Sequence, residues 1–335
     1  MEQIQVQQLA NNHDDLFVVN AARVSFNKWK DTLDPTDTGL IGYLAREQHS
    51  SPFRHVRMAI AFRADAMLSA PNLNFLNPFD RAGLVMTEVQ WKGDAYLVVK
   101  HSLFGWANLI LNCGHLYSQF FNTFVCHHLH ERFPVCAEKL GVPQQVVKPI
   151  DLQGAYVLNE PVLATLGEPW LVDVSFRCKV PLWLSRQLAK HQVMMSWNEV
   201  SRRYVSDPPE LFNQEFRTKP DGSIKQGSGL SVRNYEVPYV DVRGGASYSI
   251  KDIMLALHDW YNECVDWDIA PETLRGFMPQ NMMTQFIWSG PLPAWAHLVN
   301  LRSEGHAQKE AQYFAGQVNL HMAQTYPDMW SGLLG

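Results

Sequence analysis

The sequence predicts an α+β fold, because segments with the two-residue period of strands and segments with helical period both occur along its 335 residues. Residues 172–180 (VDVSFRCKV) alternate apolar and polar side chains, as a strand with one wet face does. Residues 56–62 alternate similarly, whereas the apolar residues of 250–267 recur at helical spacing. With 46% apolar residues, the chain can bury a large core. We therefore expect a sheet packed with helices, in one elaborated domain or two.

The composition indicates a cytoplasmic protein. No apolar run approaches the roughly 18 residues of a membrane-spanning helix, and the N-terminal residues do not resemble a secretory signal. The net charge is −5 without a basic block, which argues against nucleic acid as the main partner. Five cysteines without a C-x-x-C pair indicate reduced thiols rather than disulfides. We expect neither a nucleic-acid nor a membrane partner.

The N-terminal part begins with a short strand at residues 4–6 and a short helix over 16–25. Residues 34–37 (DPTD) form a turn that caps a helix over 39–47. Residues 48–55 (QHSSPFRH) then place two histidines and two serines around a proline, between a helix and a strand. A loop of this composition is either a polar connector or part of a binding site.

The stretch from 186 to 204 (RQLAKHQVMMSWNEVSRRY) is the most informative part of the chain. Pro181 ends the preceding strand, and Gln187, Lys190 and His191 then share one face of a short helix. The residues that follow combine charged and hydrogen-bonding side chains with aromatic ones. This composition suits a site for an anionic, planar ligand. The alternative is an amphipathic helix end followed by a solvated basic turn.

Near the C-terminus, residues 300–310 (NLRSEGHAQKE) contain Arg302 and His306, four positions apart. The two side chains share a face if one helix spans them, whereas Gly305 is equally compatible with a turn. Alone this pattern is weak, since an arginine near a helix start usually lies on the surface.

Three motifs of this chain, the most N-terminal of them in two pieces, occur in the same order as in the flavin-dependent thymidylate synthases and resemble theirs. That family has RHR, a short spacer and S-x-N-E-x-S-x-R-Y, where this chain has KHQ at 190–192 and SWNEVSRRY at 196–204. The family's A-A-R-V-S and H-x-T-P-F-x-H correspond to 21–25 (AARVS) and 49–55 (HSSPFRH). Its N-L-R-x-x-x-H-A-Q-x-E corresponds to 300–310.

The resemblance implies a catalytic domain made of residues 1–63 and 171–335, with a sheet packed with helices. Residues 64–170 are then a mainly helical insertion, because Pro-rich loops lie at both of its ends. In the family, the strand at 56–62 leads directly into the central helix. Here strand periodicity returns only at Val172.

Part of the insertion is similar in sequence to the C-terminal segment. Residues 102–112 (SLFGWANLILN) repeat the pattern of 291–300 (PLPAWAHLVN). This similarity predicts a degenerate internal duplication, in which the insertion lacks an arginine equivalent to Arg302.

As a member of this family, the chain would be a methyltransferase that converts dUMP to dTMP. The resemblance implies bound FAD, with methylenetetrahydrofolate as carbon donor and NAD(P)H, here expected to be NADPH, as reductant. It also implies a homotetramer with flavin sites between subunits. Arg302 is the expected catalytic residue, because an arginine at the pyrimidine edge stabilises the enolate-like charge that develops there. The unrelated cysteine-dependent thymidylate synthases use a thiolate, which the central motif lacks.

The resemblance also assigns binding roles residue by residue. The positions where the family contacts flavin are Ser25, His49, Ser51, Lys190, His191, Gln192, Asn198, His297, Leu301 and His306. The positions where it holds the nucleotide are Gln187, Glu199, Ser201, Arg203 and Arg302.

Several departures concern flavin and phosphate binding. KHQ in place of RHR removes two guanidinium groups, and the spacer after it has three residues where the family usually has two. Gln285 stands where the family has a phosphate-binding arginine, and prolines stand at 291 and 293 near the flavin. Arg54 replaces an acidic residue. A hydroxymethylated product of dUMP therefore stays open as an alternative.

Two other classes stay open. A zinc-dependent hydrolase would use cysteines and histidines of the insertion, among them Cys113, His115, Cys126 and His130, although their spacing matches no standard zinc finger. The predicted internal duplication accounts for the helix that carries these residues without a metal. A catalytically inactive nucleotide-binding homologue would keep the fold, but it would be expected to lose the charged groups that this chain retains.

Overall fold

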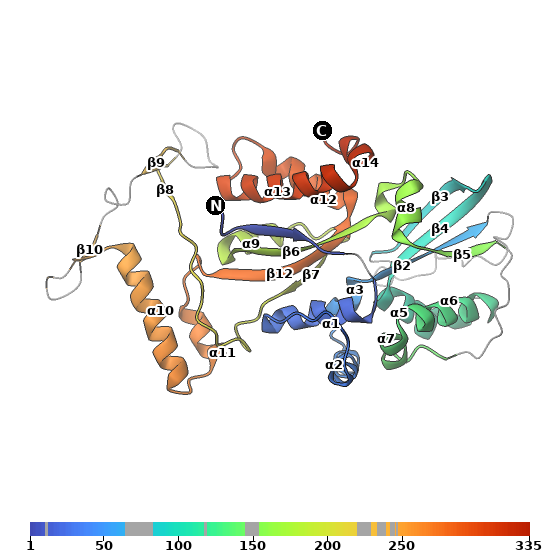
Figure 1. Ribbon diagram of the computed structural model, residues 1–335, viewed down its shortest axis with the longest axis horizontal. Helices are drawn as coiled ribbons and strands as arrows, with labels where there is room; N and C mark the ends of the chain where they lie inside the picture. Colours follow the sequence, from blue (N-terminus) through green and yellow to red (C-terminus); the bar gives the residue numbers. More distant parts are fainter. Residues whose placement is uncertain are drawn as a thin grey trace.

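The computed structural model confirms the α+β class. It describes residues 1–10, 13–63, 83–116, 119–144, 154–219, 229–232, 239–241, 245 and 247–335. Two four-stranded antiparallel sheets lie next to each other, with helices packed on them (Figure 1). Within the described part of the chain, no helix has both the length and the apolar character needed to cross a membrane.

The first sheet has the strand order β1-β6-β12-β7. Its strands are β1 (Gln5–Gln8), β6 (Asp173–Pro181), β12 (Met283–Pro291) and β7 (Ser196–Glu199). One face carries α9 (Leu182–Leu188), α12 (Leu292–Ser303), α13 (Lys309–Thr325) and α14 (Pro327–Ser331) (Figure 1). Trp288, Trp295 and Phe314 form the centre of this apolar layer.

The opposite face of the first sheet packs on the N-terminal helices. These are α1 (Asp15–Arg23), the short helix at Val24–Phe26, α2 (Pro35–Arg46) and α3 (Ser51–Arg54). Helix α2 begins at Pro35, four residues before the expected start. The earlier start follows from its N-terminus, where Asp34 and Asp37 form a capping box and proline occupies the first turn.

The second sheet has the order β3-β4-β2-β5. Its strands are β3 (Val85–Trp91), β4 (Asp94–Ser102), β2 (Arg57–Arg63) and β5 (Ala155–Leu158). Helices α5 (Leu103–Cys113), α6 (Gln119–Arg132) and α7 (Pro134–Lys139) cover one face. Helix α8 (Glu160–Thr165) and the turn Pro169–Leu171 cover the other face.

The expectation that strand periodicity returns only at Val172 was wrong, because β3, β4 and β5 precede it. Strand β4 is buried from Tyr96 to Ser102 on both faces, so its sequence does not alternate. A strand of this kind gives no two-residue signal. The division of the chain into 1–63 with 171–335 and an insertion 64–170 stays a prediction, and β2 pairs with β4 and β5, which lie in the expected insertion.

The two sheets have the same strand plan. Read from one edge, β1-β6-β12-β7 corresponds to β5-β2-β4-β3, and every pairing is antiparallel. One edge strand of each sheet comes from the part of the chain that precedes the central strands of the other sheet. Strand β1 precedes β2 in the chain but pairs with β6, and β5 precedes β6 but pairs with β2.

The strand-to-helix connections also repeat. Trp106 in α5 donates its indole N–H to the carbonyl of Met58 in β2, at 2.9 Å. Trp295 in α12 donates to the carbonyl of Val174 in β6, at 3.1 Å. Both indoles are fully buried, and each ties the helix after one central strand to the neighbouring strand.

A further group of elements lies between β7 and β12 in the sequence. They are β8 (Phe216–Arg217), β9 (Ser231–Val232), β10 (Val240–Asp241), β11 (Ser247–Tyr248), α10 (Ile250–Asp266), α11 (Pro271–Leu274) and the 3-10 turn Arg275–Phe277. Helix α10 matches the helix expected at 250–267 and extends away from the sheets (Figure 1).

Candidate active site

The structure brings Arg302 and His191 into contact. Arg302 lies in the last turn of α12, and His191 follows the end of α9. The Nε–H of Arg302 donates to Nε2 of His191 at 3.1 Å, although 111 residues separate them in the sequence. His297, also in α12, places its ring edge-on to that of His191, with the ring centroids 5.9 Å apart.

His191 is held in its neutral form. Partial burial, then the positive charge of Arg302, then the neighbouring His297 lower the pKa of His191 to about 4. The imidazole therefore accepts the Arg302 hydrogen bond near neutral pH. Because this bond uses Nε, it leaves the two terminal nitrogens of the guanidinium free of His191.

The surface around this pair mixes hydrogen-bond donors with apolar groups. Lys190 and Gln192 are exposed on the turn after α9, and Gln192 donates to the carbonyl of Ala189 at 3.2 Å. Val193 in the same turn is 71% exposed, and Leu301 beside Arg302 is 41% exposed. Exposed apolar side chains beside cations and imidazoles are suited to a flat, negatively charged ligand.

Glu199, at the end of β7, is held by three protein donors. Its carboxylate accepts from Ser185 in α9 at 3.0 Å, from Thr284 in β12 at 2.8 Å and from the indole of Trp197 at 3.2 Å. These bonds connect α9 with two strands. The carboxylate is therefore fixed within the protein in this conformation.

Ser25 and Ser201 lie together beside Glu199. The Ser25 hydroxyl donates to the Glu199 carbonyl at 3.2 Å, and the backbone N–H of Ser201 donates to the Ser25 carbonyl at 2.9 Å. Two of the recognised motifs, 21–25 and 196–204, thus meet at the edge of the first sheet. Arg203 points to the surface and pairs with Glu272 at 2.8 Å.

His55 is a residue of this region that the predicted site did not include. It is only 1% exposed, with Nε2 3.1 Å from Oδ1 of Asn198 and Nδ1 2.7 Å from the hydroxyl of Ser289. Burial lowers the pKa of His55 to about 4, and the charge of Arg57 adds to this, against the hydrogen bond to Asn198. The signal was present, since His55 ends the motif at 49–55.

Other predicted residues have different neighbours. The ring of His49 stacks on Tyr43, with centroids 5.8 Å apart, and His306 pairs with Glu304 at 2.7 Å on the surface. Ser51 is exposed at the start of α3, and Gln187 is partly buried in α9. The contacts described for His49 and His306 thus involve neither Arg302 nor His191.

A cavity of about 120 Å³ lies beside Thr284, one of the hydrogen-bond donors to Glu199. Its lining residues are Asn27, Lys179, Val200, Arg202, Val205, Asp207, Pro208, Glu210, Met283, Thr284 and Gln285. Lys179 pairs with Glu210 at 2.5 Å, and Arg202 donates to the Asp207 carbonyl. Gln285 donates to Asn27 at 3.2 Å. Of the two cationic side chains of this cavity, Lys179 is thus paired with a carboxylate, whereas Arg202 binds a backbone carbonyl and its buried Nε has no hydrogen-bond partner among the described residues.

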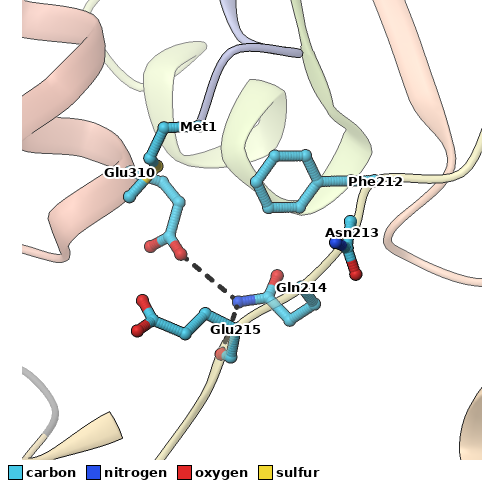
Figure 2. A pocket seen from close by; sticks show the side chains of 6 residues that line it. All are labelled: Met1, Phe212, Asn213, Gln214, Glu215 and Glu310. Atoms are coloured by element: carbon cyan, nitrogen blue, oxygen red, sulfur yellow. Dashed lines mark hydrogen bonds between the residues drawn. The ribbon is translucent and has the colours of Figure 1, made fainter.

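A larger cavity, of about 330 Å³, contains none of the predicted site residues (Figure 2). Met1, Phe212, Asn213, Gln214, Glu215 and Glu310 line it. Gln214 points toward the buried Glu310 and donates to it at 3.3 Å, as the dashed line in Figure 2 marks. The two carboxylates of this cavity, those of Glu215 and Glu310, are both ion-paired with Arg217, at 3.0 and 2.6 Å.

The cysteines of residues 64–170 do not form a metal site within the described residues. The described residues contain two groups of potential metal ligands whose members lie close together. One consists of His127, His128 and Glu131, and the other of His13, Glu160 and Asp173. Neither group contains a cysteine. Burial raises the pKa of Cys126 to about 11, against its own backbone hydrogen bond. A protonated thiol in an apolar core is a poor zinc ligand, so the structure gives the zinc hydrolase no support.

Comparison with known sequences gives a consistent result. The model of the family described as thymidylate synthase complementing protein matches residues 171–328. The flavin-dependent thymidylate synthase of Aquifex aeolicus is 27% identical over 323 residues, which cover 90% of this chain and 92% of that protein. The enzyme of the same name from Kosmotoga olearia is 29% identical over 140 residues, or 42% of this chain and 58% of that protein.

The chain is thus similar in sequence to the flavin-dependent thymidylate synthases. The family match begins just before β6 and ends in α14, so it spans the segments that contribute Arg302, His191 and Glu199. A structural comparison with a UMP/dUMP methylase, PolB from Streptomyces cacaoi, aligns 98% of this chain and 95% of that one. Its TM-score of 0.34, at 16% identity, is too low to establish a common fold.

Proposed function

We propose that this methyltransferase converts dUMP to dTMP, with bound FAD, methylenetetrahydrofolate as carbon donor and NADPH as reductant. The contact between Arg302 and His191 supports the proposal most directly. It joins two of the three family motifs at 3.1 Å across 111 residues of sequence. The proposal includes a homo-oligomer in the cytoplasm.

The residues around Arg302 have chemistry that fits a flavin. Lys190 supplies a cation for the diphosphate, and Gln192 and His297 supply further hydrogen-bonding groups on the same exposed surface. The exposed side chain of Leu301 supplies an apolar contact for the ring system. With KHQ in place of RHR, Lys190 is a point charge rather than a bidentate donor. Bound FAD supplies the hydride transfer chemistry.

In this proposal, Arg302 acts on the pyrimidine. Its terminal guanidinium nitrogens stabilise the negative charge that develops on the uracil ring as carbon 5 becomes nucleophilic. His191 fixes Nε of this side chain without adding a competing charge, because its imidazole is neutral. The arginine therefore keeps its orientation before the substrate arrives.

The nucleotide is held by Gln187, Ser201 and Arg203, while Glu199 organises their surroundings. Arg203 is paired with Glu272 on the surface, and an exposed ion pair of this kind contributes about 0–1 kcal/mol. Exchange of Glu272 for a substrate phosphate therefore costs little. The carboxylate of Glu199 connects Ser185 and Thr284, so it sets the distance between α9 and β12.

The first test is the absorbance of the purified protein. We expect an oxidised-flavin band that NADPH bleaches, and conversion of dUMP to dTMP when methylenetetrahydrofolate is added. Mass spectrometry of the product separates dTMP from the hydroxymethylated nucleotide, the alternative that the altered flavin-binding residues leave open. A colourless protein that neither binds flavin nor alters dUMP would refute the proposal.

The role of Arg302 has its own test. We expect Arg302→Ala to keep the flavin band and to lower kcat by roughly 100-fold to 1000-fold, the usual cost of losing one charge-stabilising donor. Arg302→Lys should recover part of this loss. Full turnover in the alanine variant would contradict the assigned role.

A further inference from the structure

We propose that Arg57 is a positioning residue for the turn at 189–195, which carries Lys190, His191 and Gln192. The importance of this turn for catalysis rests on the proposed function. Arg57 is the first residue of β2, in the second sheet, whereas the turn follows α9 on the first sheet. The proposal therefore connects the sheet that lacks the candidate site with the sheet that holds it.

Arg57 contacts the backbone of the turn directly. Its Nη2 donates to the carbonyl of Met194 at 2.8 Å, and its side chain is 4% exposed. Met194 has a φ of 56°, a left-handed conformation that is unfavourable for a residue with a side chain. A charge-assisted hydrogen bond at this carbonyl offsets that cost. The turn is closed on its other side by the hydrogen bond from Met195 to the Gln192 carbonyl, at 3.2 Å.

The guanidinium is itself held in place by a buried ionic group. Its Nη1 lies 3.2 Å from Asp173 of β6, and Lys100 of β4 lies 2.5 Å from the other oxygen of that carboxylate. The backbone N–H of Arg57 donates to Nδ1 of His13 at 3.1 Å. Asp173, Lys100 and His13 are all almost fully buried. The arginine is thus fixed before it reaches the turn.

The length of the turn gives this contact its significance. The spacer between Gln192 and Ser196 has three residues, Val193, Met194 and Met195, where the similar motifs have two. A longer turn has more conformations available, and so needs an additional anchor to keep one of them. The carbonyl that Arg57 binds belongs to the middle residue of this spacer. We infer that Arg57 stabilises the lengthened turn and so holds His191 against Arg302.

Lys100 provides a matched control. Both Arg57 and Lys100 are buried and both pair with Asp173, but Lys100 donates to the carbonyl of Leu171 and has no described contact with the turn. Substituting either residue by methionine therefore removes one buried charge beside the same carboxylate. Only Arg57→Met also removes the anchor of the turn.

The experiment is hydrogen exchange measured by mass spectrometry on the full-length protein, together with dUMP binding by calorimetry. In Arg57→Met we expect exchange across 189–195 to accelerate about tenfold or more, since a local opening has become easier. In Lys100→Met we expect a lower melting temperature with unchanged exchange in this turn. Arg57→Lys keeps the charge but replaces the two terminal nitrogens of the guanidinium with one ammonium group. It should fall between wild type and Arg57→Met, and it replaces Arg57→Met if that variant fails to fold.

Unchanged exchange at 189–195 in the arginine variants would overturn the proposal, and so would equal acceleration in Lys100→Met. Weaker dUMP binding in Arg57→Met but not in Lys100→Met would support it further. If wild-type protein does not bind or convert dUMP, the proposed function fails, while the exchange measurement still decides whether Arg57 anchors the turn.

Discussion

The two sheets share one strand order and one pattern of strand-to-helix hydrogen bonds, but the candidate active site lies on only one of them. Arg302 is the eleventh residue of α12, and the eleventh residue of α5, in the other sheet, is Cys113. The first residue of β6 is Asp173 and that of β2 is Arg57, and these two side chains pair with each other. The comparison teaches that the backbone plan alone does not create the site; the side chains at equivalent positions decide it.

The equivalence of the two plans predicts similar costs for the two buried tryptophans. We expect Trp106→Ala and Trp295→Ala each to lower the free energy of unfolding by about 3–5 kcal/mol, because each opens a cavity and loses the hydrogen bond to the neighbouring strand. Trp295 also donates to the carbonyl of Gly290, at 3.1 Å. Urea denaturation monitored by circular dichroism measures both. A difference of more than about 2 kcal/mol between the variants would show that the repeated bonds are not energetically equivalent.

Enzyme activity should distinguish Cys113 from Arg302, which occupy equivalent positions in α5 and α12. Cys113→Ala, made at the position equivalent to Arg302, should leave kcat for dUMP within about twofold of wild type, in contrast to the loss of about 100-fold or more expected for Arg302→Ala. Steady-state assays of the two variants side by side check this. A large loss in Cys113→Ala would give the second sheet a catalytic role that the structure does not indicate.

Acid should destabilise the protein through His55, which has no titratable counterpart before β6. His55 is buried with a pKa of about 4, and the residue in the corresponding place before β6 is the apolar Leu171. A folded-state pKa below the unfolded value of about 6.5 means that the unfolded chain binds the proton more tightly. Stability should therefore fall as pH decreases from about 6.5 to 4, by about 3 kcal/mol from His55.

The variant His55→Gln isolates this effect. It keeps a hydrogen-bonding side chain but cannot titrate, so its unfolding free energy should change less over the same pH range. Chemical denaturation at several pH values provides the measurement. Parallel pH curves for wild type and variant would mean that His55 does not contribute to acid sensitivity.

The smallest expected effect concerns the surface pair of Arg203 and Glu272. Glu272→Gln should change stability by less than about 1 kcal/mol, because both side chains are exposed. If Arg203 binds the substrate phosphate, the same change should lower the KM for dUMP, because it removes a competing carboxylate. An increase in KM would argue that Glu272 helps to orient the arginine instead.

Local sequence signals predicted much of the first sheet and its helices. Strand β6 and helix α10 occur within a residue or two of their expected places, because one has a clear two-residue period and the other a helical one. The contact of Arg302 with His191 follows from motif order and not from periodicity. It could be anticipated only because both segments resembled one family.

The second sheet was harder to predict for physical reasons. The alternation at 56–62 predicted that Arg57 faces solvent. In the structure Arg57 is buried under a second layer and pairs with the buried carboxylate of Asp173. Strand β4 is buried on both faces, so it has no alternation to detect. Pairing partners also cannot be read from periodicity, which describes one strand at a time. The exchange of β1 and β5 between sheets is invisible at that level.

That exchange has a practical consequence for anyone who shortens or tags this protein. The first ten residues belong, through β1, to the sheet that bears Arg302 and Glu199, and not to the helices that follow them in the chain. Their removal would bare the backbone N–H and C=O groups along β6, a surface on which other chains can add a strand. A truncated protein that begins at residue 13 would thus have a disrupted first sheet, far along the sequence from the site of truncation.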